Sequence, residues 1–500
     1  MSSFFETIGF ESLGQLPPFA WAELLFLLHA VVQLVIVVRV VMSKRSVGAA
    51  LAWIMIVFLV PFVGIGIYLL IGELKLGSRR MRLVRQLAAP IRERYRALDQ
   101  PTFGVRWHGM PDEWEQLSRT GENMLQVPTL SGNLLELLGD WNAIFDRMIK
   151  DIDSAGISCD FEFYIWQCGG RADEVVSAIE RAVARGVVCR DLVDAIGSQA
   201  FLRSSAATRL RTAGVVVQAA LPGGLWRLPF VRFDLRLHRK IVLIDDVIGW
   251  TGSLNMVDPR FFKKSAGVGE WVDAMVRIEG PSVEALAITF QTDWYIETML
   301  SSPDLPDLTG QQRVTKHGES PVQVLPSGPV NRVEAIERIL ITSIYAAKQE
   351  LVITTPYFVP SESLQMALTT AAQRGVKVII ILPAKVDSLL VRLASSTFKG
   401  ELLDAGVFVA QFHGGLLHTK SVTIDKCVSL FGSLNMDPRS FRLNFEITLA
   451  VYDDVFTQSL RELQQSYLDQ SELMDAETWH KRSRTSKFGE NLGRLVSPLL

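Results

Sequence analysis

The sequence predicts an α/β protein with two similar domains behind an N-terminal pair of membrane helices. Three observations predict this architecture: a long charge-free apolar run near the N-terminus, an alternation of strand-like and helix-like segments, and a second copy of that alternation. A chain of 500 residues also exceeds one ordinary core. We assign an N-terminal segment (1–18), a transmembrane hairpin (19–72, with helices at about 19–42 and 47–72), a basic linker (73–125), two α/β domains (126–310 and 311–480) and a basic amphipathic tail (481–500).

The clearest membrane segment runs from Val47 to Ile71 and contains no charged residue or histidine. Its length matches a bilayer core of about 30 Å, and a proline such as Pro61 is tolerated within a membrane helix. A second candidate at 19–38 includes Glu23 and His29, so an interfacial or signal segment is the alternative there. A signal peptide is disfavoured because the preceding residues lack basic side chains and no small-residue cleavage site follows.

Basic residues around the two apolar segments predict the topology. The flank after the second segment carries more positive charge than the turn between the segments. Since positive loops stay in the cytoplasm, the large C-terminal part is expected to be cytoplasmic. The flank comprises Lys75, Arg79, Arg80, Arg82 and Arg85, and the turn comprises Arg39, Lys44 and Arg45.

The composition excludes some classes of function. The formal net charge is −2, which gives no general attraction for nucleic acid. The four cysteines form no CxxC pair, so neither a disulfide framework nor a zinc site is expected, and a reducing compartment is favoured. The C-terminal tail mixes basic and apolar residues, which suits either an interfacial helix or a frayed tail.

The second half of the chain repeats the first. Residues 157–166 and 349–358 both read as buried strands, and each leads into an amphipathic helix that ends at a glycine, Gly186 or Gly375. The strand–helix–strand alternation predicts largely parallel sheets. Residues 303–310 read as the linker between the copies, and an insertion at 221–237 sets the first copy apart.

The repeat ends in a paired motif, HRKIVLIDDVIGWTGSLN and HTKSVTIDKCVSLFGSLN. A histidine, a lysine two residues on, an aspartate seven residues on and a Gly-Ser-x-Asn group recur at matched spacing. One His-x-Lys would carry little weight, but six identities found twice indicate a shared chemical role. The residues are His238, Lys240, Asp245, Gly252, Ser253 and Asn255 in the first copy, and His418, Lys420, Asp425, Gly432, Ser433 and Asn435 in the second.

Strand periodicity gives the motif a chemical meaning. Residues two apart share a face of a strand, so each histidine and its lysine point the same way. An ammonium that binds phosphate oxygen beside an imidazole that attacks or donates a proton suits phosphate chemistry. The Ser and Asn residues of both copies are expected to add hydrogen-bond donors for the phosphate, and the glycines are expected to let the backbone approach it.

The carboxylates divide into two groups. Asp245 and Asp425 lie an odd number of residues from their histidines, so strand geometry points them to the opposite face, in a structural role. Asp273 and Glu446 precede β-type runs in equivalent places and are expected to orient the imidazoles. No histidine has metal-ligand spacing, and a lysine beside each key histidine repels cations, so no metal is expected.

These motifs resemble the phospholipase D superfamily, whose signature is HxKxxxxDxxxxxxGSxN in two copies, and within it the bacterial cardiolipin synthases. The resemblance covers nearly the whole chain, including the EFYIW, GVGEWVD and NFEITLAV segments. It implies mixed β-sheets flanked by helices, two domains related by a pseudo-twofold axis, and a multi-pass protein of the bacterial inner membrane. It also places Asp245 and Asp425 in the catalytic signature, which conflicts with the strand argument.

The resemblance further implies a mechanism. His238 is expected to attack the phosphodiester and form a phosphohistidine, while His418 protonates the departing glycerol and then deprotonates the incoming alcohol. Lys240, Lys420 and the two asparagines would hold the phosphate. Donor and acceptor would both be phosphatidylglycerol, and the products cardiolipin and glycerol, without a metal or other cofactor and without nucleic acid as a partner.

Other functions fit parts of the sequence. A phospholipase D or nuclease-type hydrolase would use the same histidines with water as acceptor, and a phosphatidylserine synthase would use serine. Phosphatidylethanolamine is a possible donor, and a catalytically dead scaffold is disfavoured because both motifs are intact. The sequence leaves open which histidine attacks, the oligomeric state and the role of the insertion.

Overall fold

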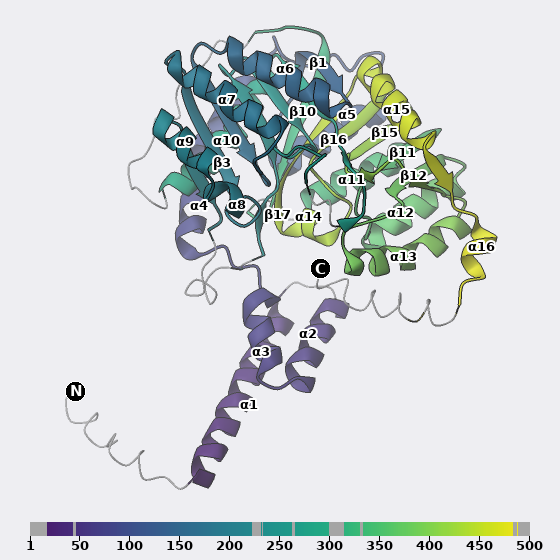
Figure 1. The fold of residues 1–500 in the computed structure, drawn as a ribbon. Helices are drawn as coiled ribbons and strands as arrows, with labels where there is room; N and C mark the ends of the chain where they lie inside the picture. The colour runs from purple at the N-terminus through teal and green to yellow at the C-terminus, as the bar shows by residue number, and fades with distance from the viewer. Residues whose placement is uncertain are drawn as a thin grey trace. The chain divides into compact units, whose positions relative to one another are not determined.

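The computed structural model describes residues 18–43, 47–222, 232, 234–262, 266–299, 315–330, 334–483 and 488 (Figure 1). The chain divides into two compact units. Residues up to Lys75 form the N-terminal unit, and most of the chain from Leu76 onward forms the main unit. The expected linker at 303–310, most of the 221–237 insertion and most of the tail lie outside the described residues.

In the N-terminal unit, α1 (Pro18–Met42) is followed by α2 (Val47–Leu59), α3 (Val63–Ile67) and a π-helical turn, η2 (Tyr68–Gly72). One described helix, over Ala22–Met42, is long and apolar enough to cross a membrane, with a mean hydropathy of 2.6. The sequence pointed to 47–71 as the clearer span, and the structure instead breaks that run into short helices.

The break has a covalent cause at Pro61. Proline lacks the N–H that would bond the Val57 carbonyl one turn earlier. The side-chain amide of Gln33 on α1 donates to that carbonyl instead, at 2.9 Å. The next residue, Phe62, has a left-handed φ of 62°, so α2 cannot continue into α3.

In the main unit, one continuous sheet runs through both copies of the repeat. The first copy has strand order β1-β9-β7-β6-β2-β3-β4 and the second has β10-β17-β16-β15-β11-β12-β13 with β18 at the edge. The copies join where β1 pairs antiparallel with β10. The first-copy strands are β1 (Thr129–Leu138), β2 (Ser158–Phe163), β3 (Val188–Asp194), β4 (Val216–Ala220), β6 (Lys240–Ile244), β7 (Ile248–Gly252) and β9 (Met275–Glu279). The second-copy strands are β10 (Ser320–Ser327), β11 (Glu350–Thr354), β12 (Lys377–Pro383), β13 (Phe408–Phe412), β15 (Ser421–Ile424), β16 (Val428–Gly432), β17 (Asn444–Val451) and β18 (Ser471–Leu473).

The sheet is mixed, so the expectation of largely parallel sheets is wrong for more than half of each copy. β2, β3 and β4 run parallel, as do β11, β12 and β13. The strands that carry the motif form antiparallel hairpins, β6 with β7 and β15 with β16. Asp245 and Asp246 both have positive φ in the first hairpin turn, which matches the right-handed twist of the two strands it connects.

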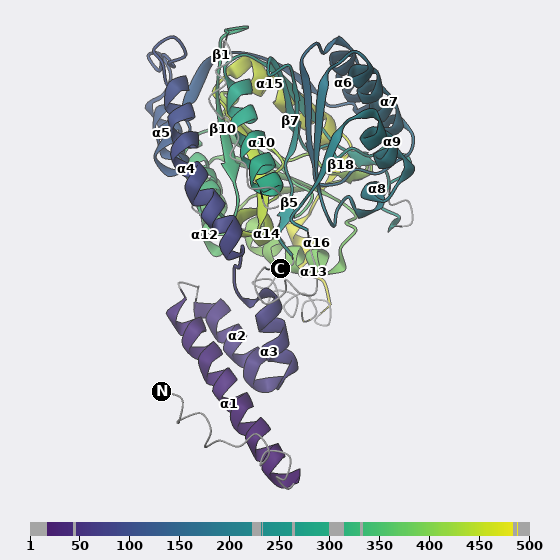
Figure 2. The ribbon, with the colours of Figure 1, turned by 90° about the vertical axis from the view of Figure 1, so that its left-hand side faces the viewer.

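Helices cover both faces of the sheet (Figures 1 and 2). One apolar core lies under the outer helices of each copy, and a further core lies where the copies meet. At that meeting point a long helix of each copy contacts a strand of the other copy: α10 contacts β10 of the second copy, and α15 contacts β1 of the first. The outer helices are α6 (Trp141–Ser154), α7 (Arg171–Ala184) and α9 (Ser205–Ala213) in the first copy, and α11 (Ala335–Ala346), α12 (Glu362–Gln373) and α13 (Leu389–Asp404) in the second; the two long helices are α10 (Ser282–Met299) and α15 (Asp454–Leu468).

The stretch at 73–125, expected as a basic linker, contains two helices that belong to the main unit. Figure 2 shows α4 (Ser78–Leu98) beside α10, and Arg80 bonds Glu297 across them at 2.6 Å. The second helix, α5 (Asp112–Leu125), packs against α11. Three basic side chains of this stretch, Arg80, Arg94 and Arg119, form ion pairs, the first two with α10.

Candidate active site

Both motif histidines lie on short segments that pair with the opposite copy of the repeat. β5 (Arg236–Leu237) runs parallel to β17, and His238 donates its backbone N–H to the Phe445 carbonyl at 2.9 Å. β14 (Leu416–Leu417) runs parallel to β8 (Trp271–Val272), and His418 donates to the Val272 carbonyl at 2.8 Å. The main chain thus brings residues that are far apart in sequence into one buried site.

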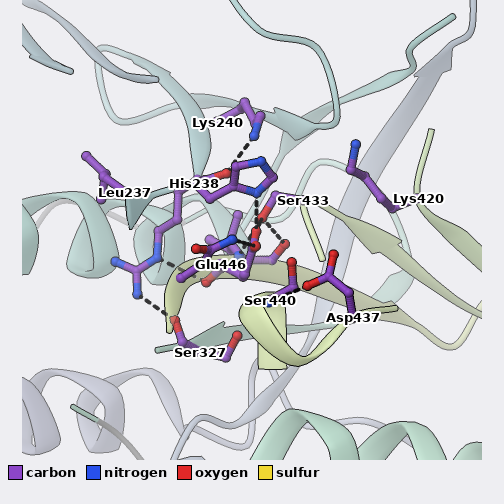
Figure 3. A network of polar contacts seen from close by, with 12 residues as sticks. Leu237, His238, Lys240, Ser327, Lys420, Ser433, Asp437, Ser440 and Glu446 are labelled. Atoms are coloured by element: carbon purple, nitrogen blue, oxygen red, sulfur yellow. Dashed lines mark hydrogen bonds and ion pairs between the residues drawn. The ribbon is translucent and has the colours of Figure 1, made fainter. Parts of the chain in front are cut away.

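Each imidazole contacts a carboxylate from the other copy. His238 Nδ1 lies 2.8 Å from Glu446 Oε2, and His418 Nδ1 lies 2.6 Å from Asp273 Oδ1. Figure 3 shows the first of these pairs, with Lys240 above the imidazole and Lys420 to its right. Because the carboxylate engages Nδ1, each ring keeps Nε2 available for chemistry.

The charges of the site favour neutral imidazoles and ionised carboxylates. Burial lowers the pKa of His238 and of His418 to about 4, against the attraction of the carboxylate beside each ring. Burial alone would raise the pKa of Asp273 and Glu446, but the nearby histidine and lysine charges and the hydrogen bonds hold both below the usual value. A neutral imidazole is the form that can attack phosphorus.

The two lysines are buried with the histidines. Lys240 Nζ donates to the His238 carbonyl at 2.7 Å, and Lys420 donates to the His418 carbonyl. An ammonium has three protons, so each lysine keeps donors for a phosphate oxygen. Burial lowers the pKa of Lys240 to about 8 and that of Lys420 well below its usual value.

The motif serines hold the carboxylates, which corrects the expectation that they face the phosphate. Ser253 donates to Asp273 at 2.6 Å, and Ser433 donates to Glu446 at 2.5 Å. Asn255 accepts from the Ile165 backbone through Oδ1, and its buried Nδ2 has no partner among the described residues. That unpartnered amide makes Asn255 a better phosphate donor than either serine.

The motif glycines also differ from expectation. A Cβ at Gly432 would lie 2.2 Å from the Ile447 carbonyl oxygen, and one at Gly252 would lie 2.4 Å from that of Ala274. Both glycines therefore permit close approach of the neighbouring strand that carries the carboxylate. No contact in the described site requires them to admit a phosphate.

The aspartates of the signature lie at the far end of their strands, as periodicity predicts, so their placement in the catalytic set is corrected. Asp245 accepts from the backbone N–H groups of residues 156, 157 and 158 at 2.7–2.9 Å. Asp425 accepts from residues 348, 349 and 350 at similar distances. Each aspartate joins its hairpin turn to the start of the neighbouring strand and takes no part in the histidine site.

Sequence reasoning missed several residues that contact the site. Tyr164 lies 5.0 Å from the His238 ring and Trp271 lies 4.3 Å from the His418 ring, measured between ring centroids. Arg239, between His238 and Lys240, donates to the Glu446 backbone carbonyl at 3.1 Å and pairs with Asp293. For Arg239, the sequence signal was strand alternation: a residue between two site residues on a strand must face the other side of the sheet.

Among the residues that the structure describes, no three or more His, Cys, Asp or Glu side chains are grouped to hold a metal ion. The four cysteines are all free.

Two repeated α/β halves with crossed histidine–carboxylate pairs define a protein of the phospholipase D type. The family described as "Cardiolipin synthase, PLD-like domain" matches residues 148–294 and 340–467, and "Phospholipase_D-nuclease N-terminal" matches residues 31–73. The chain belongs to the cardiolipin synthase family.

Curated relatives cover nearly the whole length. The chain is 42% identical over 480 residues to cardiolipin synthase A of Yersinia pseudotuberculosis serotype IB, covering 93% of this chain and 96% of that protein. Cardiolipin synthase A of Yersinia pestis gives the same values. Among solved structures, phosphatidylserine synthase of Haemophilus influenzae shares the fold, with a TM-score of 0.58 and 17% identity over 77% of this chain and 100% of that one.

Replacing an orienting carboxylate is expected to cost activity without unfolding the site. Glu446→Gln or Asp273→Asn keeps the shape but removes the charge that stabilises an imidazolium, so kcat should fall by about 10²–10⁴-fold. The measurement is phosphatidyl transfer per folded enzyme. Asp151→Asn is the matched control, because Asp151 is equally buried but pairs with Arg277 away from the histidines; an equal kcat loss in the control would contradict the assignment.

Removing the Asp245 carboxylate is expected to cost stability rather than chemistry. Asp245→Gly tolerates the positive φ but loses three backbone hydrogen bonds, so unfolding should become easier by about 2–4 kcal/mol. Asp246→Gly, in the same turn, is the control. Denaturant midpoints and kcat of the folded fraction measure the two effects separately. A kcat loss above about tenfold in folded Asp245→Gly would return this residue to the catalytic set.

Proposed function

We propose that this chain is a cardiolipin synthase that joins two phosphatidylglycerol molecules and releases glycerol through a phosphohistidine intermediate. One observation carries the proposal: each of two buried imidazoles contacts a carboxylate through Nδ1, and the lysine two residues on donates to that histidine's backbone carbonyl. That arrangement suits one nucleophile and one acid/base at a phosphodiester.

The proposed first step transfers the phosphatidyl group to the enzyme. His238 Nε2 attacks phosphorus and forms a P–N bond, while the P–O bond to glycerol breaks. His418 gives the departing alkoxide its proton. The phosphate anion raises the proton affinity of a neighbouring imidazole, so His418 is expected to take up that proton when the donor lipid binds.

In the proposed second step, the headgroup hydroxyl of a second phosphatidylglycerol loses its proton to His418 and attacks phosphorus. The P–N bond breaks, which returns His238 to its neutral form and releases cardiolipin. Lys240 and Lys420 neutralise the non-bridging phosphate oxygens in both steps, and Asn255 and Asn435 are proposed to complete the phosphate site. Burial of the site limits access of water, which favours an alcohol as acceptor.

We further propose that the protein resides in the bacterial inner membrane, with the main unit on the cytoplasmic side. The apolar helix α1 and the basic residues that follow it support this location. Phospholipids in that membrane then supply both donor and acceptor.

Product analysis tests the reaction. Purified protein with labelled phosphatidylglycerol in detergent, with and without a chelator, is expected to give cardiolipin and glycerol at the same rate in both. Phosphatidic acid alone would favour a hydrolase, and incorporation of added serine would favour a phosphatidylserine synthase. His238→Ala and His418→Ala should each reduce cardiolipin formation by more than about 10³-fold.

Trapping tests the division of roles between the histidines. A phosphatidyl donor with a nitrophenol leaving group needs no general acid, so His418→Ala is expected to accumulate a phosphatidyl group on His238. Mass spectrometry of the peptide, kept out of acid because the P–N bond is acid-labile, locates the adduct. An adduct that forms in His238→Ala and is absent from His418→Ala would reverse the two roles.

The pH dependence separates the two donors. With the nitrophenyl donor, kcat/KM requires only a neutral nucleophile and charged lysines, so it is expected to hold above the His238 pKa of about 4 and fall above the Lys240 pKa of about 8. With phosphatidylglycerol, His418 must also be protonated, and its pKa in the free enzyme is about 4. The protonated fraction falls as pH rises above that value, so kcat/KM should decline across the neutral range. Identical profiles for the two donors would contradict this protonation scheme.

A further inference from the structure

The second half of the N-terminal unit reverses direction inside the apolar region. Gly64 on α3 packs directly against α2, since a Cβ there would lie 2.2 Å from the Ile56 carbonyl oxygen. Four residues further on, the Tyr68 ring lies 5.4 Å from the Trp53 ring. Contacts that move toward the start of α2 as α3 and η2 proceed are the signature of an antiparallel helical hairpin with its tip at residues 60–62.

Contacts with α1 show how far along α1 this hairpin reaches. At the tip, the Phe62 ring lies 4.3 Å from the ring of His29, near the middle of α1. At the returning end, Glu73 forms a two-bond ion pair with Arg39, near the C-terminal end of α1. The chain therefore enters beside the end of α1, reaches about its midpoint, and comes back to the end where it started.

Helix lengths agree with this depth. At 1.5 Å per residue, the 25 residues of α1 extend about 37 Å, which exceeds a bilayer core of about 30 Å. The 13 residues of α2 extend only about 20 Å. Neither α2 nor the α3–η2 stretch is long enough to cross alone.

The tip is built to sit in hydrocarbon. Non-helical backbone at membrane depth needs its polar groups satisfied within the protein. The Val57 carbonyl accepts from Gln33, and the carbonyls of residues 60, 61 and 62 accept from the N–H groups of residues 64, 63 and 66. The side chains of Leu59 and Phe62 are 71% and 68% exposed, so the tip presents apolar surface.

The charge distribution selects the same arrangement. No lysine or arginine precedes Arg39 in the sequence. In a hairpin of two spans, Arg39, Lys44 and Arg45 would lie opposite the basic residues that follow position 74. With a hairpin that returns, all of these cations lie on one side, as the positive-inside rule favours.

We propose that α1 crosses the bilayer once and that α2, α3 and η2 form a re-entrant hairpin embedded among the acyl chains of the leaflet on the basic side. The N-terminus then lies on the opposite side from Glu73 and from the chain that follows it. This inference concerns the anchor alone and does not depend on the reaction that the main unit performs.

Single cysteines labelled from each side of the membrane test the proposal. The background carries Cys168→Ser and Cys427→Ser, and Cys159 and Cys189 stay because they are buried. Ser3→Cys, Ser43→Cys, Phe62→Cys and Leu74→Cys are each treated with a membrane-impermeant maleimide in right-side-out and inverted vesicles. Val188→Cys, on an exposed site of the main unit, reports the side of that unit.

The expected pattern is specific. Cysteines at positions 43, 74 and 188 should label from the same side, position 3 from the other, and position 62 from neither side until detergent is added. Labelling of position 43 from the side opposite to positions 74 and 188 would establish two spans and overturn the proposal. Labelling of position 62 in intact vesicles from the side opposite to position 74 would also overturn it, because the tip would then have crossed. Cardiolipin formation by each variant is a separate readout, and its loss would not alter the topology result.

Discussion

The bond between each imidazole and a carboxylate of the opposite copy is the constraint on which the main unit depends. It requires β5 to lie along β17 and β14 along β8. It also requires Gly432, which lets β16 approach β17, and Gly252, which lets β7 approach the start of β9 just after Asp273. The serines that follow the glycines then brace the same carboxylates. Neither copy of the repeat contains a complete site, because each lacks the group that orients its own histidine.

Burial and charge oppose each other at this site, and their balance sets its chemistry. Removing two lysines and two carboxylates from water is costly, and it is tolerated because the opposite charges alternate around the imidazoles. The low pKa of both rings follows from the same burial. The two ammonium groups and the two carboxylates already cancel, so a bound phosphodiester anion would add one negative charge. In the proposed mechanism, the proton taken up by His418 offsets that charge.

The residues of the site were more predictable from sequence than the contacts between them. Repetition of His-x-Lys singled out the two buried histidines, and equivalent positions before β-runs singled out Asp273 and Glu446, which contact them. Periodicity placed Asp245 away from the site correctly. It gives only the face of a strand, not the neighbouring strand, so it could not show that the serines and glycines serve the carboxylates. Hydropathy likewise measured the apolar run at 47–71 but not its break at Pro61, because proline is also tolerated within a continuous membrane helix.

The crossed pairing of the copies also bears on how such a chain arises. A polypeptide with one copy would need to meet a second before either histidine was oriented, so its activity would depend on concentration. Joining both copies in tandem replaces that encounter with an intramolecular one, at an effective concentration that dilution does not change. Thereafter the copies are free to diverge, as Arg239 and Thr419 have done at matching positions, provided that the exchanged carboxylates stay in place.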